Sequence, residues 1–376
     1  MKFILAPDSF KESMSAKKAA LAMEEGIKRV FPDAECVIIP MADGGEGTVQ
    51  SLVDGTNGEI VKVEVIGPLG EKVEAEYGLL GSGQTAVIEM ASASGLELLK
   101  KEVRNPRITT SFGTGELIKH ALDQGVKNIL IGIGGSATND GGVGMLQALG
   151  VSFKDKEGFE LPYGGGNLGR LHSIDLSGID KRLYTTKIEV ACDVTNPLIG
   201  KNGASYIFGP QKGATAEVVE ELEQNLAHYA HMIKAELGID IATVEGAGAA
   251  GGLGAGLLAF LNAELKKGIN LVIEHTNLKE RMIGARYVFT GEGSIDGQTV
   301  FGKTPFGVSS TARELNIPVV AFAGKIGKGA DILYDYGFTA IVGILRELTS
   351  LDEALKMGPE NLVVAVENVC RLIKEK

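Results

Sequence analysis

The sequence predicts an α/β protein whose strands are mostly parallel and buried. Short apolar runs rich in β-branched residues alternate with amphipathic stretches along most of the chain, a pattern typical of strands joined by crossover helices. The chain has 376 residues, a length that suits about two domains. Its 52 glycines follow no collagen-like period, so they are expected in loops and turns.

The first residues predict one β-α-β unit. Residues 2–6 form a short apolar strand, residues 7–14 a loop, and a helix begins after an N-cap at Ser15 and ends near Val30. A second strand follows at residues 36–39. The end of the chain is similar in style, with strands expected at residues 286–290, 318–323 and 338–342 and helices at residues 306–315 and 360–374.

The middle of the chain predicts a different subdomain. Residues 59–66 and 72–80 resemble strands and flank Gly-Pro-Leu-Gly at residues 67–70, a tight reversal that suits a β-hairpin rather than a crossover. The longest polar helix, residues 216–236, contains His228 and His231 three residues apart. Because no carboxylate cluster accompanies them, a solvated helix face is the simpler interpretation than a metal site.

Charge and cysteine content exclude several classes of protein. The 37 basic and 48 acidic residues give a net charge of −11, so binding to nucleic acid or to a membrane surface is not expected. Cys36, Cys192 and Cys370 form no Cys-x-x-Cys pair, which argues against a zinc site and a disulfide framework. The apolar stretch near Met1 is too short for a signal peptide, and the longest uncharged run, residues 246–261, is too short to span a bilayer. We therefore expect a cytoplasmic protein.

Four glycine-rich segments follow predicted strands, and the first two are candidate anion sites. The first reads DGGEGT at residues 43–48; an anion site built from backbone amides and a plain tight turn explain it equally well. The second reads GIGGSATNDGG at residues 132–142, after an apolar strand and before a helix. Its Ser136, Thr138 and Asp140 add hydroxyl and carboxylate groups, which favours anion or nucleotide binding.

The third and fourth segments match two nucleotide-binding fingerprints. Residues 246–251 read Gly-x-Gly-x-x-Gly; with strands at residues 239–244 and 271–273 they match the dinucleotide-binding unit of an NAD-dependent oxidoreductase. Further glycines in the supposed helix favour close packing instead. Residues 297–304 read Gly-x-x-x-x-Gly-Lys-Thr, but the expected strand ends near Thr290, seven residues early, which argues against a Walker-type P-loop.

Charged residues directly after predicted strands are further candidates. Asp8 and Lys11 follow the first strand, and Asp193 follows a strand expected at residues 188–191. Open α/β sheets bind their ligands at the carboxyl ends of the strands. A single loop aspartate or lysine is usually a turn or surface residue, whereas several that converge at strand ends indicate a functional site.

Several short motifs follow one another along the chain: APDSFK at residues 6–11 with MSA at 14–16, MADGGEGT at 41–48, GTGE at 113–116, the segment at 132–142, CDVTNPL at 192–198, GAGAAGG at 246–252, TGEG at 290–293, DGQ at 296–298 and GKTP at 302–305. Taken together, and in this order, they resemble the bacterial glycerate kinase family, of the type that includes the 2-kinases, over essentially the whole chain. One departure is Glu12, where glycine is expected from the resemblance.

The resemblance implies a kinase with two α/β domains. A flavodoxin-like domain with a doubly wound parallel sheet is expected from both chain ends, residues 1–66 and 286–376, with a second α/β domain inserted at residues 67–285. The resemblance also implies ATP and Mg²⁺ as cosubstrates and D-glycerate as acceptor. It favours the 2-hydroxyl over the 3-hydroxyl, and it removes the need for the oxidoreductase and P-loop interpretations. A homo-oligomer is compatible with the sequence.

Phosphoryl transfer requires positioning and charge neutralisation, and this requirement suggests roles for the candidates. We expect Lys11 and Lys303, with amides of residues 134–142, to hold phosphate oxygens, and Asp43 and Asp296 to hold Mg²⁺. Asp193 is expected to orient the glycerate hydroxyl as general base. Arg107 is a candidate partner for the glycerate carboxylate, chosen only for its charge beside a turn. The expected site residues are therefore Asp193, Lys11 and Asp43 as catalytic groups; Gly134, Gly135, Ser136, Thr138, Lys303, Gly44 and Gly45 around the nucleotide; and Asp8, Ser9, Arg107 and Asp296 around the substrate.

Overall fold

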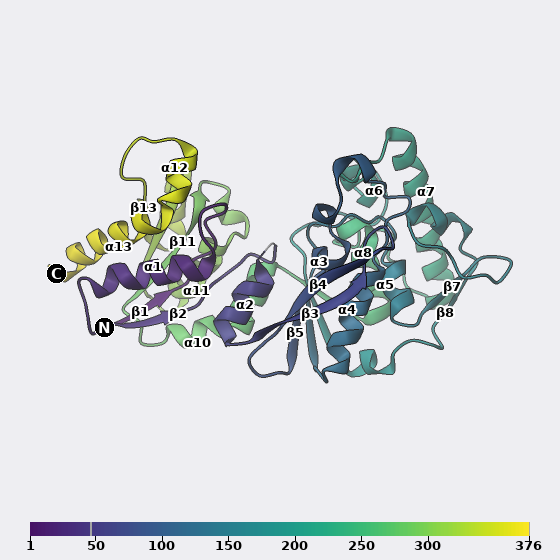
Figure 1. Ribbon diagram of the computed structural model, residues 1–376, viewed down its shortest axis with the longest axis horizontal. Helices are drawn as coiled ribbons and strands as arrows, with labels where there is room; N and C mark the ends of the chain where they lie inside the picture. The colour runs from purple at the N-terminus through teal and green to yellow at the C-terminus, as the bar shows by residue number, and fades with distance from the viewer. Residues whose placement is uncertain (46, 376) are drawn as a thin grey trace. The chain divides into compact units, whose positions relative to one another are not determined.

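The computed structural model describes residues 1–45 and 47–375, which fold into two compact units. Unit 1 comprises Met1–Asn57 and Lys267–Lys376, and unit 2 comprises Gly58–Lys266 (Figure 1). Both chain ends therefore belong to unit 1, as the similar style of the two ends suggests. The domain limits expected from the sequence, at residues 66 and 285, stay a prediction. Glu46 of the first glycine segment and the C-terminal Lys376 lie outside the described residues.

Unit 1 is built on a parallel sheet with the strand order β13-β12-β11-β1-β2. Numbered along unit 1 alone, this order is 2-1-3-4-5, the doubly wound flavodoxin-like arrangement, so the expected fold class is confirmed. The strand order reverses between β1 and β11. The strands are β1 (Lys2–Leu5), β2 (Glu35–Ile38), β11 (Tyr287–Ile295), β12 (Val319–Ile326) and β13 (Phe338–Gly343).

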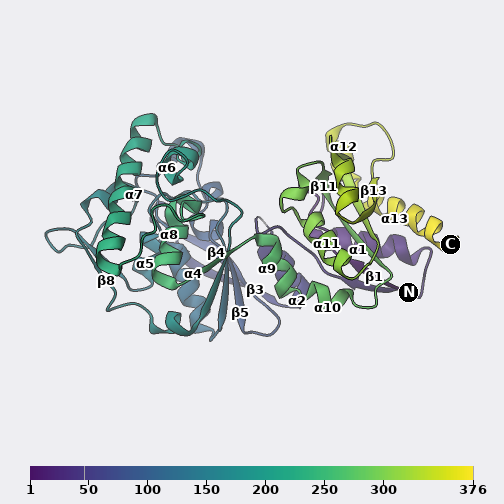
Figure 2. The same cartoon turned by 180° about the vertical axis from the view of Figure 1, so that it is seen from behind.

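Helices cover both faces of this sheet. α1 (Ala16–Lys28) and α13 (Gly358–Lys374) pack against each other on the face that buries Phe3 and Leu5. Their backbones approach closely at Gly26, where a Cβ would lie 2.6 Å from the carbonyl oxygen of Val363. α11 packs against β11 on the opposite side (Figure 2). The remaining helices are α2 (Thr48–Thr56), α9 (Gly268–His275), α10 (Leu278–Met282), α11 (Thr304–Glu314) and α12 (Leu351–Lys356).

Unit 2 is built on a mixed sheet with the order β10-β9-β6-β5-β4-β3. β3 and β4 form the predicted antiparallel hairpin, with Ile66 opposite Lys72, and the strands from β5 to β10 in this sheet run parallel. A small antiparallel pair, β7 and β8, lies apart from this sheet. The strands are β3 (Glu59–Ile66), β4 (Lys72–Leu79), β5 (Thr85–Glu89), β6 (Asn128–Gly132), β7 (Ser152–Lys154), β8 (Ser173–Asp175), β9 (Lys187–Ala191) and β10 (Glu264–Lys266).

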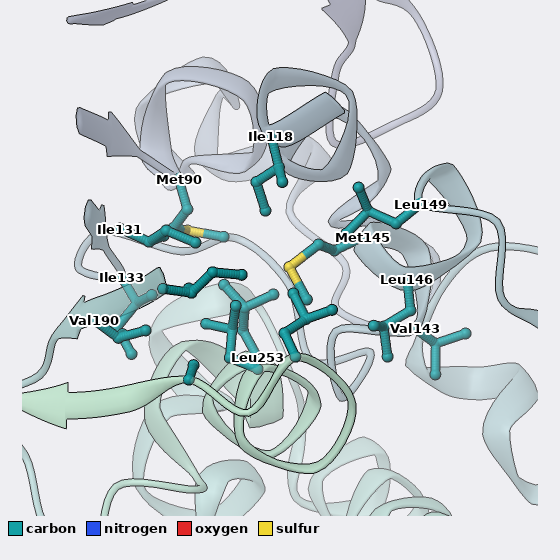
Figure 3. Packing of buried hydrophobic residues seen from close by; sticks show 14 of the residues in the cluster. Met90, Ile118, Ile131, Ile133, Val143, Met145, Leu146, Leu149, Val190 and Leu253 are labelled. Carbon is teal, nitrogen blue, oxygen red and sulfur yellow. The ribbon is translucent and has the colours of Figure 1, made fainter. Parts of the chain in front are cut away.

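The helices of unit 2 close an apolar core around the parallel strands. Figure 3 shows Ile131 of β6, Ile118 of α4, Met145 of α5 and Leu253 of α8 converging in this core. Its helices are α3 (Ala91–Ser94), α4 (Phe112–Asp123), α5 (Val143–Ala148), α6 (Ala204–Phe208), α7 (Ala216–Leu237) and α8 (Ala249–Leu261). Short 3₁₀ turns of the two units are η1 (Leu96–Leu98), η2 (Lys101–Val103), η3 (Gly165–Arg170), η4 (Lys181–Thr185), η5 (Pro210–Lys212), η6 (Thr299–Phe301) and η7 (Ala330–Tyr336).

Local signals explain most of these elements. The Ser15 hydroxyl accepts a hydrogen bond from the Lys18 amide and so begins α1 where the sequence predicts. His228 belongs to α7, and its partly buried Nε2 is hydrogen-bonded to the Leu171 carbonyl. Among the helices that the structure describes, none has the length and apolar character needed to cross a bilayer.

Candidate functional site

A cavity of about 590 Å³ lies at the carboxyl ends of the unit 1 strands. Its walls come from residues at or after the ends of β1, β2, β11 and β12, among them Asp8, Asp43, Glu292 and Lys325. It thus spans the point between β1 and β11 at which the strand order reverses, where doubly wound sheets bind their ligands. Its volume lies within the range of small-molecule sites.

Asp8, Asp43 and Glu292 form the acidic part of this cavity. Burial raises the pKa of Asp8 to about 6; the Thr304 hydroxyl, which donates to Asp8 Oδ2, acts against this shift, and the charge of Asp43 adds to it. Burial also raises the pKa of Glu292 to about 7, with Lys303 acting against the shift and the charges of Asp8 and Asp43 adding to it. The three acids repel one another, so a bound cation would stabilise the group.

Lys11, Lys303 and Lys325 line the same cavity. Lys303 Nζ lies 3.6 Å from Glu292 Oε1 and donates to the Ser294 carbonyl at 3.4 Å. Lys11 and Lys325 are exposed, and within residues 1–45 and 47–375 no carboxylate lies within 4.0 Å of either ammonium group. Two cations without an acidic partner, in a chain of net charge −11, suit a polyanionic ligand such as a phosphate chain.

Replacing Glu292 by glutamine is expected to stabilise unit 1 more at pH 8 than at pH 5. The native pKa of Glu292 is about 7 and its ordinary value 4.5, so the native state binds the proton more tightly and wild-type stability falls as the pH rises through this interval. Glutamine resembles the protonated acid and does not titrate, so the variant does not lose stability as the pH rises. The gain in unfolding free energy at pH 8 is at most about 3 kcal/mol.

Urea unfolding of the two proteins at both pH values, without divalent cations, measures this gain. Glu314→Gln is the matched control, because Glu314 is an exposed acid of unit 1 that pairs with Lys279 at 2.5 Å. An equal stability difference at pH 5 and pH 8 would contradict the raised pKa of Glu292.

The turn after β1 carries Asp8, Ser9 and Lys11 into the cavity. The Asp8 amide donates to the Gly291 carbonyl of β11 at 2.9 Å, and the Ser9 amide donates to Asp8 Oδ1 at 2.6 Å. Glu12 has a φ of +64°, in the left-handed region that favours glycine. Glu12 therefore adopts a left-handed conformation at the position where the sequence analysis expected glycine.

The first glycine segment forms a turn that holds Asp43. Asp43 Oδ1 accepts a hydrogen bond from the Gly45 amide at 3.1 Å, and Gly44 has a φ of +96°. The Gly45 amide is therefore occupied by a side chain of the same turn. Of the two interpretations that the sequence left open, the tight turn is the one that these contacts support.

The fourth segment differs from its predicted form. β11 does not end near Thr290 but runs to Ile295, paired with β12 through Ile295 and Ile326. The prediction was wrong because two glycines and polar residues look like a loop. Close pairing instead requires glycine at Gly291, where a Cβ would lie 2.3 Å from the Phe322 carbonyl oxygen.

The P-loop interpretation fails for a reason that the sequence did not offer. In a P-loop, free backbone amides surround the phosphate. Here the amides of Gly297, Gln298, Thr299 and Phe301 already donate within the protein: to the Lys328 carbonyl, to Asp296 Oδ1, to the Asp296 carbonyl and to the Gln298 carbonyl. Asp296 itself caps this turn and is not among the residues that line the cavity.

The second glycine segment lies in unit 2 after β6 and contains both exposed and buried groups. Gly134 and Gly135 are exposed, and a Cβ at Gly134 would meet nothing within 4 Å. Ser136 Oγ and the Thr138 carbonyl both accept hydrogen bonds from Lys212 Nζ, at 2.8 and 2.6 Å. Burial lowers the pKa of Lys212 to about 7. The lysine therefore fixes the shape of the segment from inside.

Asp140 of the same segment is a structural group. Its carboxylate accepts hydrogen bonds from the Ser111 amide and hydroxyl, both at 2.8 Å, and from the amides of Gly142 and Gly144 at 3.2 and 3.3 Å. Burial raises its pKa, and these four donors act against the shift. Asp140 thus ties the start of α4 to the start of α5 rather than facing a ligand.

The third segment is not a dinucleotide-binding unit. Residues 239–244 form no strand, and residues 271–273 belong to helix α9 instead of a strand. A helix alone after the glycines does not make a β-α-β unit, so the oxidoreductase alternative is wrong.

The glycines of this segment allow close packing instead. A Cβ at Gly248 would lie 2.0 Å from the Pro197 carbonyl oxygen, and one at Gly251 would lie 2.0 Å from the Thr138 carbonyl oxygen. Gly251 also has a φ of +67°. The start of α8 therefore presses against the backbone of the second glycine segment and supports its shape.

Arg107 and Asp193 also lie in unit 2. Arg107 is half-exposed, and its Nη2 lies 3.1 Å from Glu221 Oε1, so its charge already has a partner. Asp193 is exposed and follows the last residue of β9, Ala191, as predicted. Asp8, Ser9, Lys11, Asp43 and Lys303 share the unit 1 cavity, whereas the residues of the second glycine segment belong to unit 2 with Arg107 and Asp193.

The sequence analysis missed Glu292, Lys325 and Lys212. Glu292 lies in the quoted TGEG motif, and an expected strand end at Ile295 would have placed it at the edge of the sheet. Lys325 follows the predicted strand at residues 318–323, so the rule that selected Asp8 applies to it as well. Lys212 offers no comparable signal, because a lysine in a short turn is usually solvated.

Comparison with known proteins agrees with the order of motifs. The model of the glycerate kinase family matches residues 3–374. The chain is 52% identical to the glycerate kinase of Haemophilus influenzae over 100% of both chains, and 52% identical to the glycerate 2-kinase of Escherichia coli K12 over 98% of this chain and 97% of that protein. A crystal structure of a Salmonella typhimurium LT2 protein, 51% identical, superposes with a TM-score of 0.93 over 100% of this chain and 98% of that one.

Proposed function

The chain belongs to the glycerate kinase family, and we propose that it transfers the terminal phosphoryl group of ATP to the 2-hydroxyl of D-glycerate in the presence of Mg²⁺. The observation that carries this proposal is the unit 1 cavity, where lysines and neighbouring carboxylates meet at the reversal point of a doubly wound sheet. The name of the Escherichia coli relative supports the 2-hydroxyl. A cytoplasmic location goes with this proposal, and all three cysteines are free.

The lysines of the cavity supply the positive charge that phosphoryl transfer needs. The transition state spreads negative charge over the phosphate oxygens, and most of the catalytic effect comes from neutralising and positioning them. Lys11 and Lys303 hold these oxygens, and Lys325 adds a third ammonium group from the end of β12. The exposed amides around Gly134 and Gly135 form a further anion-binding segment in unit 2.

Mg²⁺ fits the acidic part of the cavity. The ion is a hard cation that prefers carboxylate oxygens. Burial raises the pKa values of Asp8 and Glu292, and repulsion from the neighbouring acids, which a dication relieves, adds to both shifts. Asp43, Asp8 and Glu292 would hold it. Asp296, the other ligand expected from the sequence, already accepts the Gln298 amide. When bound, Mg²⁺ neutralises charge on the phosphate oxygens.

Asp193 is proposed as the general base. Its carboxylate takes the proton of the glycerate 2-hydroxyl as that oxygen bonds to the terminal phosphorus. The bond from this phosphorus to the bridging oxygen of ATP breaks, and ADP leaves with the electron pair. Asp8 and Ser9 stay proposed as substrate contacts. Arg107 would bind the glycerate carboxylate only after leaving Glu221.

³¹P NMR of the purified protein with D-glycerate, ATP and Mg²⁺ tests the proposal directly, since it reports transfer and the position of the new phosphate together. We expect the signal of 2-phosphoglycerate, and we expect EDTA to remove it. A 3-phosphoglycerate signal would retain the kinase but contradict the choice of hydroxyl. Absence of transfer from ATP under conditions where the protein is folded would contradict the proposed reaction.

A further inference from the structure

We propose that the apolar end of the unit 1 cavity binds the base of the nucleotide, so that the nucleotide lies along the carboxyl edge of the sheet from β13 toward β1. This inference rests on the proposed function and names the part of the site that the sequence left unassigned. The apolar end is formed by two residues after β13 and by helix α12, namely Ile344, Leu345, Leu351, Ala354 and Leu355.

The order of the strands determines which apolar, basic and acidic side chains follow one another along this edge of the sheet. Ile344 follows β13, and its amide donates to the Ala323 carbonyl of β12 at 2.9 Å. Lys325, two residues further along β12, is the register partner of Ser294 in β11. Beyond β11 lies β1 with Asp8. Along this edge the apolar residues therefore lie at β13, Lys325 lies in β12, and the acids Glu292 and Asp8 lie at β11 and β1, where Lys303 and Lys11 also line the cavity.

This order matches the order of groups in a nucleoside triphosphate. A base is largely apolar on its faces, the phosphate chain is polyanionic, and the terminal phosphate is the group that meets the metal ion. Neighbouring strands lie about 4.8 Å apart, so the distance from β13 to β1 is about 14 Å. An extended nucleoside triphosphate covers a comparable length, with its terminal phosphate at Asp8 and Glu292.

The apolar end is joined to the rest of the cavity by direct contacts. The Ser13 hydroxyl, in the turn that carries Lys11, donates to the Leu355 carbonyl of α12 at 2.5 Å. Gly358 packs on the same serine, because a Cβ at that position would lie 2.1 Å from Ser13 Oγ. The turn after β1 thus carries Lys11 and also contacts the apolar end, so one ligand can touch both.

Two leucines of the apolar end are unusually exposed for residues that line a cavity. Leu345 is 51% exposed and Leu351 is 70% exposed. Large apolar side chains gathered at a cavity rim are typical of a ligand contact, since a flat apolar ligand would cover them. A nucleotide base is the occupant that fits both this surface and the lysines beside it.

The test compares the affinity for a nucleotide with the affinity for its phosphate chain alone. Isothermal titration calorimetry of the full chain with Mg²⁺ measures binding of AMP-PNP and of inorganic tripolyphosphate. Leu351→Asn and Leu345→Asn keep the side-chain size and remove apolar contact, so each is expected to weaken AMP-PNP binding at least about tenfold. Tripolyphosphate binding is expected to stay at the wild-type value.

Leu348→Asn is the matched control. Leu348 lies in the same loop, is fully exposed at 104%, and does not line the cavity, so this variant is expected to bind both ligands like wild type. Wild-type affinity for AMP-PNP in both test variants would overturn the base site while leaving the kinase intact. Failure of the wild-type protein to bind AMP-PNP would overturn the proposed function as well. An equal loss of tripolyphosphate binding in the test variants would also overturn the base site.

Discussion

The substitution Asp193→Asn is expected to lower kcat by about 10²–10⁴-fold while the protein stays folded. Asparagine keeps the size of the side chain but cannot accept the proton of the glycerate hydroxyl at neutral pH. Asp193 is exposed in the segment after β9, so the change does not disturb a packed core. Release of ADP in a coupled assay measures turnover, and thermal unfolding followed by circular dichroism measures the fold.

Asp240→Asn is the matched control for this experiment. Asp240 is an exposed acid of unit 2 that pairs with Lys234 at 2.7 Å, so its loss is expected to leave turnover unchanged. Wild-type turnover in Asp193→Asn would eliminate this residue as the general base. A variant that loses turnover only because it is unfolded would show a changed melting curve, which separates a structural role from a catalytic one.

The substitution Gly251→Ala is expected to destabilise the protein by more than about 3 kcal/mol. Two costs combine at this position. The backbone of Gly251 has a φ of +67°, which is unfavourable for alanine, and the new Cβ would lie 2.0 Å from the Thr138 carbonyl oxygen. Backbone atoms cannot rotate out of the way, so the start of α8 must move away from the second glycine segment. Urea unfolding measures the loss.

Gly238→Ala separates these two costs. Gly238 ends α7 with a φ of +73°, and a Cβ there would meet nothing within 4 Å. Alanine at this position is destabilised only by the left-handed backbone, so we expect the free energy of unfolding to fall by about 1 kcal/mol. Equal losses in the two variants would contradict the close contact between Gly251 and Thr138.

The strands and helices that the sequence predicted well carry a strong local signal. Ser15 caps α1, and residues 67–70 force the reversal between β3 and β4. β11 carries no such signal beyond Thr290, because Gly291 is required by the Phe322 carbonyl of the neighbouring strand and not by local propensity. Apolar periodicity therefore predicts that a strand exists. It does not predict where the strand ends when pairing with the neighbouring strand determines which residues fit.

The glycine motifs likewise do not reveal from sequence which atoms surround them in the folded protein. The sequence at residues 246–251 matches a dinucleotide-binding pattern, but Gly248 and Gly251 lie against the carbonyl oxygens of Pro197 and Thr138 rather than against a pyrophosphate. The motif indicates only that a Cβ is not tolerated at these positions. It does not indicate whether a ligand or another part of the chain occupies the space.

The sequence by itself determined the α/β class, the family and the contribution of both chain ends to one sheet, because periodicity, composition and the order of motifs are properties of the chain alone. Only the tertiary structure decided that Glu292 and Lys325 stand with Asp8, Asp43 and Lys11, since pairing of β1 with β11 joins residues almost 300 positions apart. It also determined the pKa values of Asp8 and Glu292. The raised pKa values of Asp8 and Glu292 come from burial and from neighbouring charges, which exist only after the strands have met.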